Sequence, residues 1–280
     1  MKIGAVYVLY NPNISLLQKS LACTALQIEH IYVVDNSDCF AYEKIDFGSN
    51  VIYLSCNGNK GIAYALNLAC SKAIEDGCDW VLTLDQDSVI PPNMIKEYSL
   101  FLANNAFDHI GLLTSQVNLY DGDNHTPTNT ITEVLLCYTS GSFMNLKAFL
   151  KIGGFTEELF IDYVDFDYCL NLRLNNYHIY RINSVILEHH LGNITEYKLG
   201  GKHLFYVTNH NYIRRYYMTR NSRCVRDKYK QYFPEVDFGF SAFLVAVFKI
   251  TFFEKNRLKK YRSICKGYLD YKNGRMGKYK

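Results

Sequence analysis

Apolar and polar positions along the first part of the chain alternate in the manner of an α/β protein. Short apolar runs bounded by polar residues predict buried strands, at 3–9, 30–35, 50–54 and 79–84. Between these runs apolar residues recur at helical spacing and predict helices, at 14–26, 61–76 and 92–105. Strands that alternate with helices favour a sheet covered by helices, so the pattern predicts the α/β class.

The second part of the chain is less regular. Two further apolar runs, at 109–115 and 132–138, flank a polar loop at 118–130. The pattern then predicts a helix that starts near Asp162 and runs to Asn176, and a strand pair at about 178–188.

From residue 203 onward the pattern becomes helical, basic and aromatic, and the charge balance changes with it. The net charge of +3 conceals two opposite parts: residues 1–196 hold 10 Lys/Arg and 22 Asp/Glu, and residues 197–280 hold 20 Lys/Arg and 5 Asp/Glu. We therefore predict a core domain over 1–200 and a helical, basic C-terminal region over 201–280. A basic segment of this kind usually meets an anionic surface.

The amino-acid composition limits the class of protein and the cellular compartment that we expect. With 49% hydrophobic and 20% charged residues, the chain is typical of a folded, core-forming protein. The nine cysteines include no CxxC pair, which favours free thiols and a reducing, cytoplasmic compartment. The apolar run at 3–9 is too short for a signal peptide. No nucleic-acid module motif is present, so nucleic acid is not an expected partner.

Acidic residues stand at the ends of two predicted strands, where open α/β sheets bind their ligands. Asp35 ends one strand, and Asp85 and Asp87 follow another after a wholly apolar run. An isolated Asp in this position is commonly a turn residue. A pair spaced Asp-x-Asp is different, because two adjacent carboxylates repel each other unless a cation or proton lies between them. Mg²⁺ or Mn²⁺ suits such a site.

Three other segments are candidates for chemistry. The glycine-containing turn at 57–63 leads into a helix and could offer backbone amides to a phosphate. Three acids cluster near a helix start, at Asp162, Asp165 and Asp167, where one could act as a base and another as a cap. On a helix, the first two would share a face. Lastly, two adjacent histidines end an apolar run and are candidate metal ligands, His189 and His190.

Taken in order, these motifs make the chain recognisable. It resembles glycosyltransferase family 2, and within that family the bacterial rhamnosyltransferases. The resemblance spans residues 4 to about 221 and rests on eight landmarks: Val8-Leu9-Tyr10-Asn11-Pro12, Val34-Asp35-Asn36-Ser37, Asn59-Lys60-Gly61-Ile62-Ala63, Asp85-Gln86-Asp87-Ser88, Ser140-Gly141-Ser142, Phe160-Ile161-Asp162-Tyr163-Val164-Asp165, His189-His190-Leu191-Gly192 and Tyr216-Tyr217-Met218-Thr219-Arg220-Asn221.

The resemblance implies a GT-A fold, a Rossmann-like mixed sheet flanked by helices with a helical C-terminal appendage, and a role for each landmark. The donor nucleotide sugar would meet Tyr10, Asn11, Asp35, Asn59, Gly61 and Asp85. Asp87 and His189 would hold Mg²⁺ or Mn²⁺, with His190 as the alternative ligand. Asp165 would deprotonate the acceptor hydroxyl. The remaining residues on the acceptor side would be Asp162, Asp167, His190 and Arg220.

This chain departs from many relatives at two positions. Val164 stands where they have Glu, and Asn171 stands where they often have Arg. Arg173 is a possible substitute for that arginine. The first difference bears on the acidity of the base.

The implied activity is inverting, metal-assisted transfer of one sugar from a nucleotide-sugar donor to a surface-polysaccharide acceptor, with dTDP-L-rhamnose as the expected donor. A transferase using a UDP-hexose or UDP-galactofuranose is the first alternative. The Asp85-Gln86-Asp87 segment also resembles the nucleophile loop of haloacid-dehalogenase-type phosphohydrolases. An inactive sugar-nucleotide-binding protein is a further alternative.

The C-terminal region predicts the location of the enzyme. Residues 238–253 form an apolar run of 16 residues that contains Lys249, shorter than the ~20 needed to span a bilayer. The basic segment 255–262 follows. Such a composition is typical of an interfacial membrane helix. We expect a peripheral enzyme at the inner face of the cell membrane with a lipid-linked acceptor; a core helix or a homo-oligomer contact is the alternative.

Overall fold

The computed structural model describes residues 1–39, 47–105, 109–118, 125–188, 194–200, 202–236, 238 and 240–280. The chain forms two compact units. The N-terminal unit comprises Met1–Glu157 and Val164–His190, and the C-terminal unit comprises Glu158–Tyr163 and Leu191–Lys280. The domain boundary predicted at residue 200 stays a prediction.

The N-terminal unit is built on a mixed sheet of eight strands in the order β3-β2-β1-β4-β7-β5-β8-β6. Its first half is parallel and comprises β1 (Ile3–Leu9), β2 (His30–Asp35), β3 (Val51–Ser55) and β4 (Trp80–Asp85). Its second half comprises β5 (Ile110–Asn118), β6 (Ile131–Glu133), β7 (Ser142–Asn145) and β8 (His178–Glu188). β7 is antiparallel to both β4 and β5, and β6 is antiparallel to β8.

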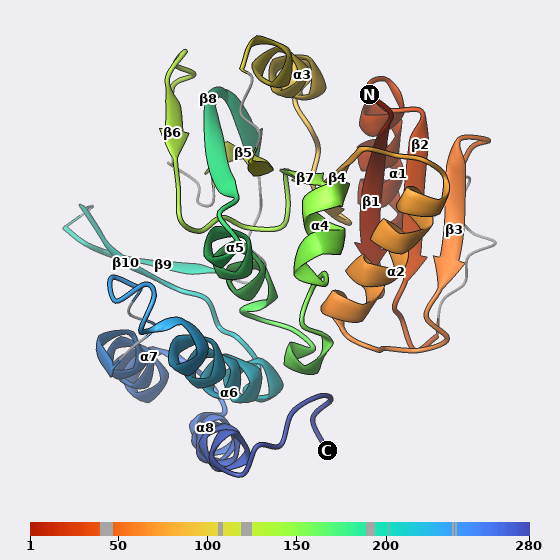
Figure 1. Cartoon of the computed structure of the whole chain (residues 1–280). Coiled ribbons are helices and arrows are strands. Elements are labelled where there is room, and N and C mark those ends of the chain that lie inside the picture. Colours follow the sequence, from red (N-terminus) through yellow and green to blue (C-terminus); the bar gives the residue numbers. More distant parts are fainter. Residues whose placement is uncertain are drawn as a thin grey trace. The chain divides into compact units, whose positions relative to one another are not determined.

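Helices cover both faces of this sheet (Figure 1). They are α1 (Ile14–Ala25), α2 (Ile62–Glu75), α3 (Met94–Asn104), α4 (Leu146–Ile152) and α5 (Val164–Leu174). α1 begins at the Asn13 cap, whose side chain accepts from the Ser15 and Leu16 amides. Tyr7 of β1 is fully buried and bonds Ser20 and Thr24 of α1 through its hydroxyl. Burial raises the pKa of Tyr7 to about 12, so the phenol stays neutral and satisfied inside the core.

The four strands and three helices predicted from the first part of the sequence are confirmed, with ends shifted by at most two residues. The predictions for the second part need three corrections. The strand pair at 178–188 is one strand, β8, whose register against β5 shifts between Ser115 and Gln116. The run 132–138 is mostly irregular, since β6 ends at Glu133. α5 begins at Val164 rather than Asp162, so Asp162 and Asp165 do not share a helical face.

The C-terminal unit contains a β-hairpin, whose second strand occupies residues 203–207, for which a helical pattern was predicted. β9 (Thr195–Leu199) pairs antiparallel with β10 (Lys202–Val207). In the described residues that follow, the predicted helical pattern is present as α6 (Tyr212–Tyr229), α7 (Phe240–Phe253) and α8 (Arg257–Lys272). Gly267 of α8 lies directly against α6, where an added Cβ would come 2.6 Å from the Tyr216 carbonyl oxygen. Among the described residues, no helix is long and apolar enough to cross a membrane.

Candidate active site

The carboxyl edge of the parallel strands brings the predicted donor residues together. In the ladders that flank β1, Asp35 of β2 lies opposite Leu9 and Asp85 of β4 lies opposite Val8. β1 therefore ends between two acidic strand ends. From β1 the chain adds β2 and β3 on one side and then returns to place β4 on the other side, so the strand order reverses between β1 and β4. In open α/β sheets, the carboxyl edge at such a reversal forms the crevice that binds nucleotides.

Asp35 is almost fully buried and already holds two hydrogen bonds. Its carboxylate accepts from the Tyr53 hydroxyl at 2.8 Å and from the Ser37 amide at 2.9 Å. Burial, and then the charge of Asp35, raise the pKa of the Cys56 thiol to about 11. Each carboxylate oxygen can accept a second bond, so Asp35 is held in place and keeps acceptor capacity for a ligand.

Side-chain oxygens that accept hydrogen bonds from backbone amides connect the strand ends to one another. The Gln86 side chain accepts from the Tyr10 amide at 2.8 Å, which joins the ends of β1 and β4. The Ser37 hydroxyl accepts from the Asn11 amide at 2.9 Å and joins β1 to β2. Asn36 accepts from the Lys60 amide at 2.8 Å and reaches Asn59 at 3.3 Å. Gln86, Ser37 and Asn36 were not predicted as site residues, although they stand within the motifs that identified the site.

The glycine-containing turn does not present its amides as the sequence suggested. The amides of Asn57, Asn59, Lys60 and Gly61 donate to side chains of Ser55, Asp38, Asn36 and Asn59, respectively. Gly61 adopts φ 96° at the start of α2, a conformation that suits glycine. The turn is thus held internally, and its role in binding the donor stays a prediction.

The predicted metal site is only partly described. Asp85 is half-buried and Asp87 is exposed at the loop after β4, while His189 and His190 lie outside the described residues. Among the residues that are described, no group of three or more His, Cys, Asp or Glu side chains could hold a cation. A hard cation that keeps substrate phosphates as ligands needs only one or two protein carboxylates, so Asp87 and Asp85 fit that type of site.

Asp165 stands in the first turn of α5 and lines a small cavity of the N-terminal unit. Tyr138, Thr139 and Ser142 line the same cavity, together with two thiols whose sulfur atoms lie 3.6 Å apart, Cys137 and Cys169. The hydrogen bond between Cys169 and the Cys137 thiol, and then burial, raise the pKa of Cys169 well above its ordinary value. Asp165 is the one carboxylate among the described residues that line this cavity.

The other acids of the cluster have structural partners. Asp167 is buried and accepts from the Thr156 hydroxyl at 2.6 Å. Asp162, which precedes α5, forms an ion pair with Arg214 of α6. It belongs to a strained segment in which Phe160, Asp162 and Tyr163 have φ of 68°, 63° and 66°.

Helix α6 holds this strained segment within the C-terminal unit. The Asn221 side chain donates to the carbonyl oxygens of Leu159, Ile161 and Asp162 at 2.8–2.9 Å. Arg220 has no exposed surface and also donates to the Leu159 carbonyl, at 3.0 Å. Both residues therefore shape the chain immediately before Asp165.

The fold is that of an α/β protein, with acids at the carboxyl edge of its parallel strands, where α/β sheets bind ligands. The family model "Glycosyl transferase family 2" matches residues 7–164. The chain belongs to glycosyl transferase family 2, its fold is GT-A, and it is a glycosyltransferase with a nucleotide-sugar donor. Membership of this family supersedes the phosphohydrolase alternative.

Relatives and solved structures agree with this assignment. The chain is 28% identical over 241 residues to dTDP-rhamnosyl transferase RfbF of Shigella flexneri, covering 79% of this chain and 78% of that protein. Its fold resembles S. aureus TarS 1–349 in complex with UDP-GlcNAc (TM-score 0.53, 15% identity, 98% and 92% of the two chains). It also resembles GalNAc-T7 with UDP, GalNAc and Mn²⁺ (TM-score 0.57, 12% identity, 71% of this chain and 44% of that one).

Proposed function

We propose that the protein is an inverting rhamnosyltransferase that moves L-rhamnose from dTDP-rhamnose to a hydroxyl of a lipid-linked surface polysaccharide. The position of Asp35 and Asp85 on either side of the end of β1 carries the donor part of this proposal. The similarity to a dTDP-rhamnosyl transferase over 79% of the chain supports the identity of the sugar.

On the donor side, Asp35 would accept a hydrogen bond from the base, and Asp85 would lie near the ribose. Tyr10 and Asn11 would contribute from the end of β1, and Asn59 and Gly61 from the turn before α2. Asp87, with His189, would hold Mg²⁺ or Mn²⁺, which neutralises charge on a departing diphosphate.

On the acceptor side, Asp165 would take the proton of the attacking hydroxyl. Attack from the face opposite the diphosphate inverts the anomeric centre in one displacement, without a covalent intermediate. Asp162 and Arg220 would act indirectly, because one is paired with Arg214 and the other is fully buried against backbone carbonyls. We likewise assign Asp167 a supporting role, since Thr156 already engages its carboxylate.

The donor is tested by calorimetric titration of the wild-type protein with dTDP-rhamnose, UDP-glucose and UDP-galactofuranose. We expect tight binding of the dTDP sugar alone. A clear preference for either uridine donor would refute the rhamnose assignment and leave the glycosyltransferase assignment intact.

The base is tested by Asp165→Asn, which keeps the shape of the side chain and removes its ability to accept a proton. We expect transfer to fall by ~10²–10⁴-fold, with unchanged affinity for the donor. Asp162→Asn is the comparison: it loses the ion pair with Arg214 and should affect stability more than the chemical step. If Asp162→Asn abolished transfer and Asp165→Asn were nearly silent, the assigned base would be wrong.

A further inference from the structure

Helix α7 of the C-terminal unit exposes a face made of large apolar side chains. Leu244, Val245, Phe248 and Phe252 are 49%, 52%, 50% and 62% exposed. At 100° per residue these four positions fall within one side of the helix, while the fully buried Ile250 falls on the opposite side. We call these four residues the α7 face. Single exposed apolar residues are ordinary, but a continuous apolar helix face marks an interaction surface.

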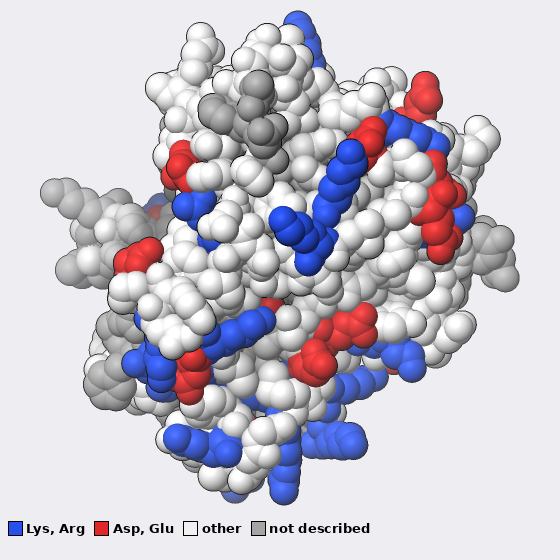
Figure 2. Space-filling view, viewed as in Figure 1, with Lys and Arg blue, Asp and Glu red and all other residues white. Residues whose placement is uncertain are grey.

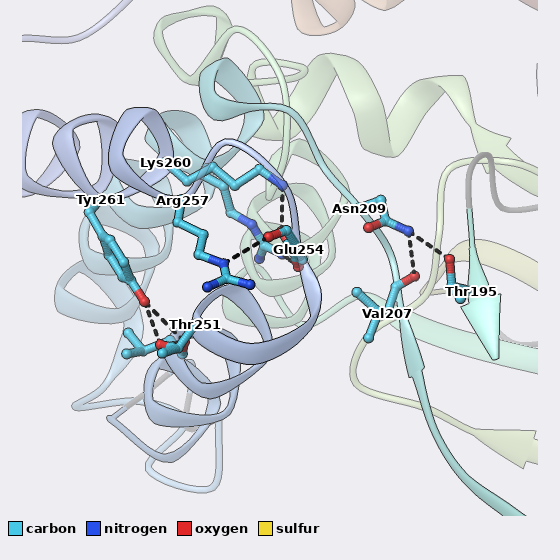
Figure 3. Close-up of polar contacts among 10 residues, drawn as sticks. Thr195, Val207, Asn209, Thr251, Glu254, Arg257, Lys260 and Tyr261 are labelled. Atoms are coloured by element: carbon cyan, nitrogen blue, oxygen red, sulfur yellow. Dashed lines mark hydrogen bonds and ion pairs between the residues drawn. The ribbon is translucent and has the colours of Figure 1, made fainter. Parts of the chain in front are cut away.

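Polar contacts near the end of α7 hold this helix in place (Figure 3). Glu254 follows α7, and its carboxylate is fully buried between Arg215 at 2.5 Å and Lys260 at 2.6 Å. One turn earlier, the Thr251 hydroxyl bonds the Tyr261 hydroxyl at 2.5 Å. These contacts fasten α7 to α6 and α8, so the helix cannot easily roll to bury its apolar face.

Exposed cations follow the α7 face in the chain. Lys255, Arg257, Lys259 and Arg262 are exposed, and within the described part of the chain none of them pairs with an acidic side chain. Figure 2 shows Lys and Arg side chains gathered over the C-terminal unit, in the lower part of the view. Lys260 does not belong to this set, because it is 5% exposed and committed to Glu254.

The apolar α7 face and the exposed cations that follow it in the chain together indicate what binds this part of the C-terminal unit. A second copy of the chain would bring the same cations against themselves, and like charges disfavour that contact. An anionic lipid surface satisfies both sets, since acyl chains receive the apolar side chains and phosphates receive the cations. With 14 residues, α7 is too short to span a bilayer, which takes ~20.

We propose that α7 lies in the interface of an anionic bilayer, with the α7 face inserted and with Lys255, Arg257, Lys259 and Arg262 on the lipid headgroups. The inference deepens the proposed function, because it rests on a lipid-linked acceptor and names the surface that would meet the acceptor's membrane. Docking itself needs neither donor nor acceptor.

The test is flotation of the full chain with vesicles, in the absence of any nucleotide sugar. Vesicles of phosphatidylcholine alone are compared with vesicles in which one third of the lipid is phosphatidylglycerol, at low and at high salt. We expect binding that requires the anionic lipid and falls with salt. Replacing the four exposed cations with Gln should weaken binding by about 600-fold, because each contributes about fivefold near an anionic leaflet.

The apolar contribution is tested by Phe248→Ser with Phe252→Ser, which we expect to weaken vesicle binding by about tenfold or more. The matched control is Leu100→Ser with Leu150→Ser, two residues of the N-terminal unit that are 46% and 59% exposed. Circular dichroism should show that both double variants are folded, and only the α7 variant should lose vesicle binding.

Three results would overturn the inference. The wild-type protein could ignore anionic vesicles at low salt, or the control could lose as much binding as the α7 variant. Light scattering without lipid could instead show a dimer that Phe248→Ser with Phe252→Ser dissociates, so that a second copy covers the face. Vesicle binding without sugar transfer to any acceptor would refute the proposed function and leave the docking surface in place.

Discussion

Arg220 is fully buried although its side chain carries a permanent charge. Its guanidinium donates to the carbonyl oxygens of Gly277 at 2.7 Å and Leu159 at 3.0 Å. It also lies 5.3 Å from the ring centre of Tyr216 and 5.1 Å from that of Tyr217. Charge-assisted bonds to carbonyls and contact with aromatic faces replace the water that burial removes. Arg220, although it belongs to one of the family motifs, therefore has a structural role: it joins α6 to the backbone at Leu159 and Gly277.

His210 lies between β10 and α6, and its protonation should make the free energy of unfolding depend on pH. Burial, and then the charges of Arg214, Arg215 and Lys260, lower its pKa from 6.5 to about 3. The folded form therefore stays neutral where the unfolded form takes up a proton. Stability from this group is complete above pH 6.5 and is lost as pH falls toward 3, by about 1 kcal/mol at one pH unit below 6.5.

The measurement is urea unfolding of the wild type and of His210→Gln at pH 7.5 and pH 5.5. The loss of stability on acidification should be smaller in the variant by about 1 kcal/mol, whatever the substitution costs at neutral pH. An equal loss in the two proteins would show that His210 takes up a proton in the folded state.

At the scale of elements, α6 organises the C-terminal unit. It bonds the strained segment before α5 through Asn221, pairs with Asp162 through Arg214, and packs closely on α8 at Gly267. One helix thus fixes both the C-terminal helices and the segment that leads to the proposed base.

Gly267→Ala tests the closeness of the two helices. In an exposed helix, Ala is favoured over Gly by ~1 kcal/mol. Here the new Cβ would meet the Tyr216 carbonyl oxygen at 2.6 Å, and this backbone atom cannot move without displacing α6. We expect net destabilisation of about 1–3 kcal/mol, because overpacking outweighs helix propensity.

Denaturant unfolding measures the effect, with Cys265→Ala as the control. Cys265 is exposed on the same helix, and its substitution should leave stability within about 0.5 kcal/mol of the wild type. A stabilised Gly267→Ala protein would mean that α6 and α8 separate at little cost.

For the whole molecule, the proposed donor residues lie within the N-terminal unit, so donor binding should stabilise that unit against unfolding. At 100-fold its Kd, a ligand contributes ~2.7 kcal/mol. We expect the donor to raise the melting temperature more with Mn²⁺ than with chelator, because the cation would link Asp87 to the diphosphate.

Asp87→Asn should close the gap between Mn²⁺ and chelator, as measured by thermal unfolding with the donor. Glu75→Gln is the control, since this exposed carboxylate at the end of α2 should leave the gap intact. Equal donor stabilisation of the wild type with and without chelator would argue against a metal-held diphosphate.

The sequence by itself determined the parallel strands, their helices and the acids at the strand ends. These features are local: the period of apolar residues selects strand or helix, and a strand-end acid such as Asp35 or Asp85 follows from position in the chain. The sequence also determined the family, because a set of short motifs in a fixed order can be recognised without knowing which residues are in contact. The identity of the sugar, the base and the metal remain predictions.

Only the tertiary structure decided which polar groups are free to act. Lys260 belonged to the basic segment expected to face a membrane, and Arg220 was predicted on the acceptor side. Both are buried by distant partners, Lys260 by Glu254 and Arg220 by the Gly277 and Leu159 carbonyls. Asp162 leaves the predicted helix because α6 holds its backbone in a left-handed conformation. Each outcome depends on contacts between segments far apart in the chain, and such contacts leave no periodic trace in the sequence.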